Sequence, residues 1–122
     1  MAGQSISIIL SKLEGDDDLE RITANVDPRY QAAAIMRSRD PGKALLFHSI
    51  GKSGRKAVAN LFGKRERIAK GLGIEEGEIH KHLLKSIENP LGCKEVPSPM
   101  GERAGPEELL KLPVLTHYER DA

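Results

Sequence analysis

The sequence predicts an α+β domain, in which a small mixed sheet is flanked by helices. Two observations support this fold class. Apolar residues recur at helical spacing in several segments, and short apolar or alternating runs typical of strands lie between those segments. In addition, the run Ala44–Phe47 and a second strand-like segment, 56–62, are separated by Lys52-Ser53-Gly54, which suggests a central strand within a hairpin. The length of 122 residues fits one compact unit with its own hydrophobic core.

The first element is expected to be an amphipathic helix that Ser5 caps and Gly15 ends. Its apolar residues recur at helical spacing: Ile6, Ile9, Leu10 and Leu13. The acidic run 16–18 reads as a solvated turn. A strand should follow, because Ile22, Ala24 and Val26 alternate with polar residues and so should share one buried face.

Asp27-Pro28 predicts the start of the next helix, with Asp27 as its side-chain cap and Pro28 at the first helical position. From this start the helix should carry the Ala-rich segment Tyr30 to Arg39 and end at Asp40-Pro41-Gly42.

Two further helices follow the hairpin. A short basic helix opens at Gly63 and closes at Gly73, with three inward-facing residues: Ile68, Ala69 and Leu72. A helix from Glu75 carries one apolar stripe as far as Asn89-Pro90, formed by Ile79, Leu83 and Ile87.

The rest of the chain predicts a connector and the start of another sheet. The segment 91–106 is rich in Pro and Gly, which favours an extended connector before a helical turn at Glu107–Leu110. The final stretch, 112–122, has an apolar run and then a charged turn, as in a strand entering a new sheet. No further strand in this chain is expected to pair with it.

Composition excludes several classes of function. Lys and Arg number 19 against 18 Asp and Glu, so no global charge attracts nucleic acid or lipid. The single cysteine, Cys93, excludes an internal disulfide and suits a reducing compartment, so we expect a cytoplasmic protein. No apolar run is long enough to span a bilayer, and the N-terminus lacks signal-peptide features. Aromatic residues are too few to form stacking platforms for bases.

Two glycine motifs resemble phosphate-binding loops but are incomplete. Gly51-Lys52-Ser53 resembles the end of a P-loop, yet Leu46 stands where that motif needs a glycine, and a hairpin should follow instead of a helix. Gly71-Leu72-Gly73 lacks the third glycine, since Glu76 occupies its place, and it should cap a helix C-terminus.

Other candidate groups also have simpler interpretations. His80 and His82 would point to nearly opposite sides of a helix, which spoils joint metal ligation. Cys93 beside Lys94 suggests a reactive thiol, but no histidine base is placed for it. His117 and Asp121 suggest a relay pair without a nucleophile.

A basic patch is the remaining candidate: Lys64, Arg65, Arg67 and Lys70, interrupted by Glu66. It would suit phosphate, although most such clusters are solvated helix faces. The residues alone therefore give no complete catalytic set.

The order of segments resembles the N-terminal domain of the UbiD-type decarboxylase family. The resemblance is carried by these segments, in order: 19–23 leading into Val26-Asp27-Pro28, Ala32–Ile35, Ala44–Phe47, Asn60–Gly63, 65–69, Leu72-Gly73, Pro90, Cys93-Lys94-Glu95, and Leu112–His117 with Asp121-Ala122. Each segment alone indicates the family only weakly, but all of them together, in this order, indicate it specifically.

The resemblance implies a carboxy-lyase that reversibly decarboxylates aromatic, heteroaromatic or α,β-unsaturated acids with prenylated FMN. It also implies a Glu-Arg-Glu set that handles the proton, a divalent metal (Mn²⁺ or Mg²⁺) and K⁺ at the flavin phosphate, and a flavin prenyltransferase as cofactor supplier. The complete enzyme would be a homo-oligomer. All of those site residues belong to a following split-barrel domain, so no catalytic, cofactor-binding or metal residue is assigned to this chain.

On this resemblance, residues 1–90 form the α+β N-terminal domain, and residues 91–122 form a connector and first strand toward a missing catalytic domain. The chain is then a fragment or a separate subunit, inactive alone, that supports the catalytic domain. The alternative is a small stand-alone interaction or regulatory protein with this fold, which docks through the basic face or the Pro-rich tail.

Overall fold

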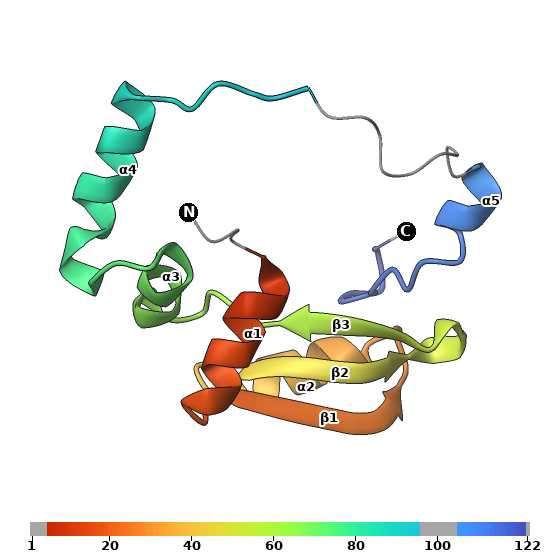
Figure 1. Cartoon of the computed structure of the whole chain (residues 1–122). Helices are drawn as coiled ribbons and strands as arrows, with labels where there is room; N and C mark the ends of the chain where they lie inside the picture. Colours follow the sequence, from red (N-terminus) through yellow and green to blue (C-terminus); the bar gives the residue numbers. More distant parts are fainter. Residues whose placement is uncertain (1–4, 96–104, 122) are drawn as a thin grey trace.

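A three-stranded sheet in the order β1-β2-β3 forms the centre of the computed structural model, which describes residues 5–95 and 105–121 (Figure 1). β1 (Leu19–Val26) runs parallel to β2 (Ala44–Ile50), which pairs antiparallel with β3 (Arg55–Ala59). The mixed sheet, its central strand and the hairpin are therefore confirmed. β3 ends before the predicted residue 62 because Asn60 takes a left-handed φ of 54° and its side-chain amide donates to Met36 O.

The strict alternation predicted for β1 is wrong at Ala24, which is exposed. Ile22 pairs with Phe47, and the next pair is Asn25 with Ser49. β1 therefore has one more residue than β2 between these two pairs, which is a β-bulge. Ala24 lies in this irregular stretch, and Ile22 and Val26, but not Ala24, pack in the core.

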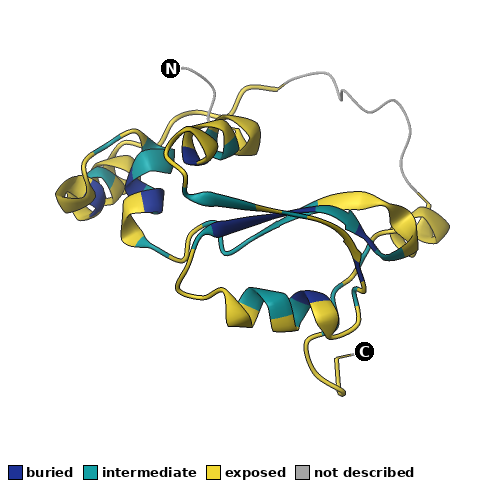
Figure 2. Cartoon of the chain, turned by 90° about the horizontal axis from the view of Figure 1, so that it is seen from below, coloured by how far each residue is buried: buried dark blue, intermediate teal, exposed yellow. Residues whose placement is uncertain are grey.

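One face of the sheet is covered by α2 (Gln31–Ser38), which Figure 2 shows lying below the strands. The β1-α2-β2 unit is thus a crossover between parallel strands. The core is aliphatic except for one phenylalanine, and it consists of Val26, Ala32, Leu45, Phe47 and Ile50. Four of its five residues come from β1 and β2, so the sheet supplies most of the core.

The predicted start of α2 is wrong by three residues. The Asp27 side chain accepts from the Arg29 N–H and so caps a turn, while the backbone N–H of Asp27 donates to Gln31 Oε1. Tyr30 occupies the position before the helix with φ 67°, a left-handed conformation that is uncommon for a side chain of this size.

The other face of the sheet meets α1 (Ile6–Gly15) and, farther along, α3 (Arg65–Leu72) (Figures 1 and 2). As predicted, Ser5 caps α1 by accepting from the Ile8 N–H at 3.4 Å. Gly73 ends α3 in a left-handed conformation with φ 71°, which glycine adopts without steric cost. A Cβ at Gly71 would lie 3.4 Å from Ile9 Cδ1, so α1 and α3 approach closely there.

Arg67 is not part of a solvated basic face, because its side chain is 2% exposed. Its Nε and Nη2 donate to the two carboxylate oxygens of Asp18, each at 2.6 Å. Nη1 donates to Asn60 O at 2.9 Å, and Nη2 also donates to Gly42 O at 2.5 Å. This one guanidinium therefore joins α3 to the segments that precede β1, precede β2 and follow β3.

The acidic run 16–18 is likewise not a purely solvated turn. Each of its carboxylates forms an ion pair: Asp16 with Lys70, Asp17 with Lys43 and Asp18 with Arg67. Two of these three partners lie on α3, so the run fixes that helix against the end of α1.

Beyond α3 lie a 3₁₀ turn (Glu76–Glu78), α4 (Ile79–Glu88) and, after the connector, α5 (Pro106–Leu109). The predicted α4 stripe forms, but only Ile79 of its three residues is buried. Most of the predicted connector, residues 96–104, lies outside the described residues. None of the helices in 5–95 or 105–121 is both long and apolar enough to cross a membrane.

We expect Arg67→Met to lower the free energy of unfolding by about 3 kcal/mol, because it leaves Asp18 and two carbonyl oxygens without their partner. Urea denaturation followed by circular dichroism measures the change. The matched control is Arg65→Met, which removes an exposed pair with Glu76 and should cost less than about 1 kcal/mol. Equal effects of the two substitutions would show that the buried guanidinium carries no special stabilisation.

Acid should weaken the fold through Asp18. The hydrogen bonds from Arg67 hold the pKa of the Asp18 carboxyl below its ordinary value of 3.8, aided by the charges of Arg67 and Lys64 and opposed by burial. Because the folded-state pKa is depressed, the stabilisation is complete above about pH 4 and is lost as pH falls through the folded pKa. We expect Asp18→Asn to be less stable than wild type at pH 7 and to lose less stability between pH 4 and pH 2.5. Parallel curves for the two proteins would contradict this.

Candidate functional site

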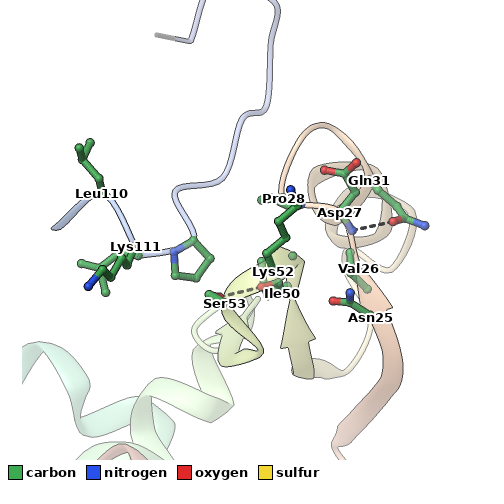
Figure 3. A pocket seen from close by; sticks show the side chains of 13 residues that line it. Asn25, Val26, Asp27, Pro28, Gln31, Ile50, Lys52, Ser53, Leu110 and Lys111 are labelled. Atoms are coloured by element: carbon green, nitrogen blue, oxygen red, sulfur yellow. Dashed lines mark hydrogen bonds between the residues drawn. The ribbon is translucent and has the colours of Figure 1, made fainter. Parts of the chain in front are cut away.

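A hollow of about 730 Å³ lies at the carboxyl ends of β1 and β2, the place where α/β sheets commonly bind ligands. Figure 3 shows Asp27, Pro28 and Gln31 on one side of it, Leu110 and Lys111 on the other, and Lys52 and Ser53 between them. The full lining is Asn25, Val26, Asp27, Pro28, Gln31, Ile50, Gly51, Lys52, Ser53, Leu110, Lys111, Leu112 and Pro113.

Local turns already use most polar groups of this hollow. Ser53 Oγ donates to Ile50 O and accepts from the Arg55 N–H, which shapes the turn between β2 and β3. Asn25 Oδ1 accepts from the Ser49 hydroxyl. These contacts hold the rim in shape and leave Lys52 and Lys111 as its cationic groups.

The segment 112–121, which we call the strap, closes one side of the hollow and returns to the sheet end. The Thr116 N–H donates to Pro28 O at 3.0 Å, and the Tyr30 N–H donates to Thr116 O at 2.9 Å. Leu115 packs against the core beside the sheet. The sequence predicted no further strand for this stretch to pair with, and it did not predict the isolated parallel bridge that Thr116 forms with Arg29, outside the named strands.

Tyr30, which has a left-handed backbone, contacts the strap. Its N–H donates to Thr116 O, and Arg29 lies over its ring at 5.3 Å. Tyr30, His117 and Tyr118 line a second hollow of about 590 Å³ along α2. An uncommon backbone conformation thus occurs where the strap meets the end of the sheet.

His117 and Asp121 do not form a relay. Asp121 Oδ2 accepts from the backbone N–H groups of His117 and Tyr118, at 2.8 and 2.9 Å. Both hydrogen bonds hold the pKa of the Asp121 carboxyl below its ordinary value, and the bond from the Tyr118 N–H has the larger effect. The carboxylate therefore closes a turn at the end of the strap and leaves the imidazole without an orienting acid.

The remaining candidates stay apart. Lys52 lies in the turn between two antiparallel strands with no helix after it, so it is not a P-loop lysine. Gly73 caps α3 as expected. His80 and Cys93 are exposed and His82 is half-buried. In the predicted basic patch, the Arg67 side chain is buried, and Lys70 and Arg65 form ion pairs with acidic residues.

The described residues do not fit a metal or a flavin phosphate. No three or more His, Cys, Asp and Glu side chains in 5–95 and 105–121 gather closely enough to hold a metal ion. At the hollow, a phosphate would meet the Asp27 carboxylate beside Lys52 and Lys111. Neither a metal ion nor a flavin phosphate therefore has a complete set of ligands among the described residues.

Sequence reasoning missed two contacts that organise the two ends of the sheet, the Asp18–Arg67 pair at one end and the strap bridge at the other. A bidentate pair across 49 residues leaves no local pattern, although an arginine on the inward side of a short helix is a usable signal. The strap bridge is a single residue pair, far shorter than the runs by which strands are recognised.

The chain matches a known protein family over more than half of its length. Residues 10–87 match the family described as 3-octaprenyl-4-hydroxybenzoate carboxy-lyase N-terminal domain. This range holds β1 to β3, α2 and α3, and it therefore includes the whole sheet and the Arg67 contacts.

Two curated relatives are named anhydromevalonate phosphate decarboxylase. The protein from Methanosarcina mazei is 36% identical over 92% of this chain, and that from Methanothermobacter thermautotrophicus is 31% identical over 79%. The matched regions are 26% and 22% of those proteins, so the chain spans about a quarter of their length.

Two solved structures of the UbiD-class enzyme HmfF from Pelotomaculum thermopropionicum share the fold. An evolved dimeric form in complex with prFMN gives a TM-score of 0.83 at 31% identity, with 95% of this chain and 29% of that chain covered. A complex with FMN gives 0.79 at 32% identity, with 92% of this chain and 26% of that chain covered. Sequence and fold agree, and the chain belongs to the UbiD family as one of its N-terminal domains.

Proposed function

We propose that this chain supports the flavin-binding catalytic domain of a UbiD-like carboxy-lyase and is not catalytic alone. In this proposal the complete enzyme reversibly decarboxylates an aromatic, heteroaromatic or α,β-unsaturated acid with prenylated FMN. The names of the relatives and the prFMN in the HmfF complex support this assignment. The cofactor, its divalent metal and K⁺ belong to the catalytic domain, and a flavin prenyltransferase supplies the prenylated FMN.

The proposal rests on the strap, because one side of this segment packs against the core and its other side is exposed. Leu115 packs against the core, whereas Val114 is 78% exposed and Leu112 and Tyr118 are also exposed. An alternating segment with one apolar face uncovered is suited to a second packing surface. We assign that surface to the catalytic domain, so residues 1–90 form the supporting domain and 91–122 form its connection.

This arrangement gives the chain a structural part in the reaction. The modified flavin supplies the bond-breaking chemistry, and a UbiD-like site needs an acid matched to the proton step. The chain supplies a rigid base for the catalytic domain: the Arg67 contacts fix the sheet end, and the Thr116 bridge fixes the strap. Its effect on catalysis is therefore to position the part that binds the flavin.

The isolated 122-residue chain should release no CO₂ from aromatic or α,β-unsaturated acids, even with prenylated FMN, Mn²⁺ and K⁺ present. The reason is that, in our proposal, the flavin, its metal and the acid for the proton step all belong to the catalytic domain. Isotopic CO₂ release measures this, with the longer Methanosarcina mazei relative as the positive control for its own substrate. Turnover by the chain alone would overturn the supporting role.

A chimera should test the docking surface. We expect this chain, in place of the matched quarter of the Methanosarcina mazei protein, to give an enzyme that retains flavin and decarboxylates anhydromevalonate phosphate. Val114→Asp should weaken docking by about 2 kcal/mol, since it buries a charge where an apolar side chain belongs, and so lower flavin retained after gel filtration.

The matched control in the chimera is Ile6→Asp, the same kind of change at an exposed residue of α1. It should leave flavin retention unchanged. A chimera that folds but retains no flavin, or equal losses from both substitutions, would contradict the assignment of the strap as the docking surface.

A further inference from the structure

The hollow at the carboxyl ends of β1 and β2 receives two opposite charges from adjacent backbone segments. Gly51 makes this possible, because its left-handed φ of 54° lets the turn after β2 approach Pro28. A Cβ at Gly51 would lie 3.0 Å from Pro28 Cδ, so a larger residue would push the two segments apart. Asp27 precedes Pro28 and Lys52 follows Gly51, and both side chains line the hollow (Figure 3).

Both of these charged groups retain capacity for a ligand. Asp27 Oδ1 accepts from the Arg29 N–H at 2.7 Å, which occupies only one of the two carboxylate oxygens. Among residues 5–95 and 105–121, Lys52 forms no ion pair, and neither does Lys111 on the other side of the hollow. One carboxylate oxygen and two ammonium groups are therefore left to contact a bound molecule.

The rest of the hollow is mostly apolar. Val26 and Ile50, both buried, line it from the sheet, and Leu112 and Pro113 line it from the strap. Its volume of about 730 Å³ is typical of sites for small molecules and gives room for a large side chain. Its place at the carboxyl ends of two parallel strands is also the usual one for ligands in α/β sheets.

The two opposite charges select the class of ligand. Asp27 repels a dianion such as phosphate, and a purely apolar molecule would take water from both charges without replacing it. An α-amino acid carries an ammonium and a carboxylate on one carbon, so the first can meet Asp27 while the second meets Lys52. Its side chain then lies against the apolar lining. A peptide terminus carries only one of these charges and matches the hollow less well.

We propose that this hollow binds a free α-amino acid with a large apolar side chain. Asp27 holds the ammonium, Lys52 holds the carboxylate, and Leu112 and Pro113 of the strap contact the side chain. Both charged residues are exposed, so each contact adds little and the Kd is about 1 mM. The proposal goes beyond the proposed function and does not depend on it.

An NMR titration of the isotope-labelled 122-residue chain with L-phenylalanine, to about 20 mM at about pH 6.5, tests this site. We expect saturable shifts of the backbone N–H groups of Gly51, Lys52 and Leu112. N-acetyl-L-phenylalanine lacks the ammonium and L-phenylalanine amide lacks the carboxylate, so each should bind about fivefold more weakly. Free glycine, which has the two charges but no side chain, should also bind more weakly.

Two substitutions test the assigned contacts. Asp27→Asn and Lys52→Gln should each raise the Kd for L-phenylalanine about fivefold. The asparagine oxygen can still accept from the Arg29 N–H, so the turn is kept, and circular dichroism checks the fold. The matched control Lys56→Gln removes an exposed cation from β3, outside the hollow, and should leave the Kd unchanged.

Three results would overturn the proposal. The first is the absence of saturable shifts with L-phenylalanine. The second is equal affinity for N-acetyl-L-phenylalanine, which would make the hollow a simple anion site. The third is the same Kd for wild type, Asp27→Asn and Lys52→Gln, which would place the ligand elsewhere on the molecule.

Discussion

The contacts of the Arg67 guanidinium are the constraint on which the rest of the structure depends. The side chain is buried, and its donors meet a carboxylate and two carbonyl oxygens from three separate segments. A buried guanidinium is tolerated only when its charge and its donors are matched, so these segments must hold their positions together. That requirement fixes α3 against the sheet and sets where β1 and β2 begin.

At the opposite end of the sheet, a smaller set of contacts holds the strap. These are the two backbone hydrogen bonds of Thr116 and the packing of Leu115, and Tyr30, which makes one of those bonds, has a left-handed conformation. The strap is therefore held at a defined place, with Val114 exposed. In the function that we propose, this geometry suits a domain that positions another.

The sequence by itself determined the elements whose signals are local. The Ser5 cap, the apolar central strand from Ala44 and the glycine at position 73 each act within a few residues, so their spacing predicted them. Only the tertiary structure decided that Arg67 is buried and that the strap pairs with Pro28 and Tyr30. Those contacts join residues far apart in the chain, and their energy exists only once the sheet has brought the partners together.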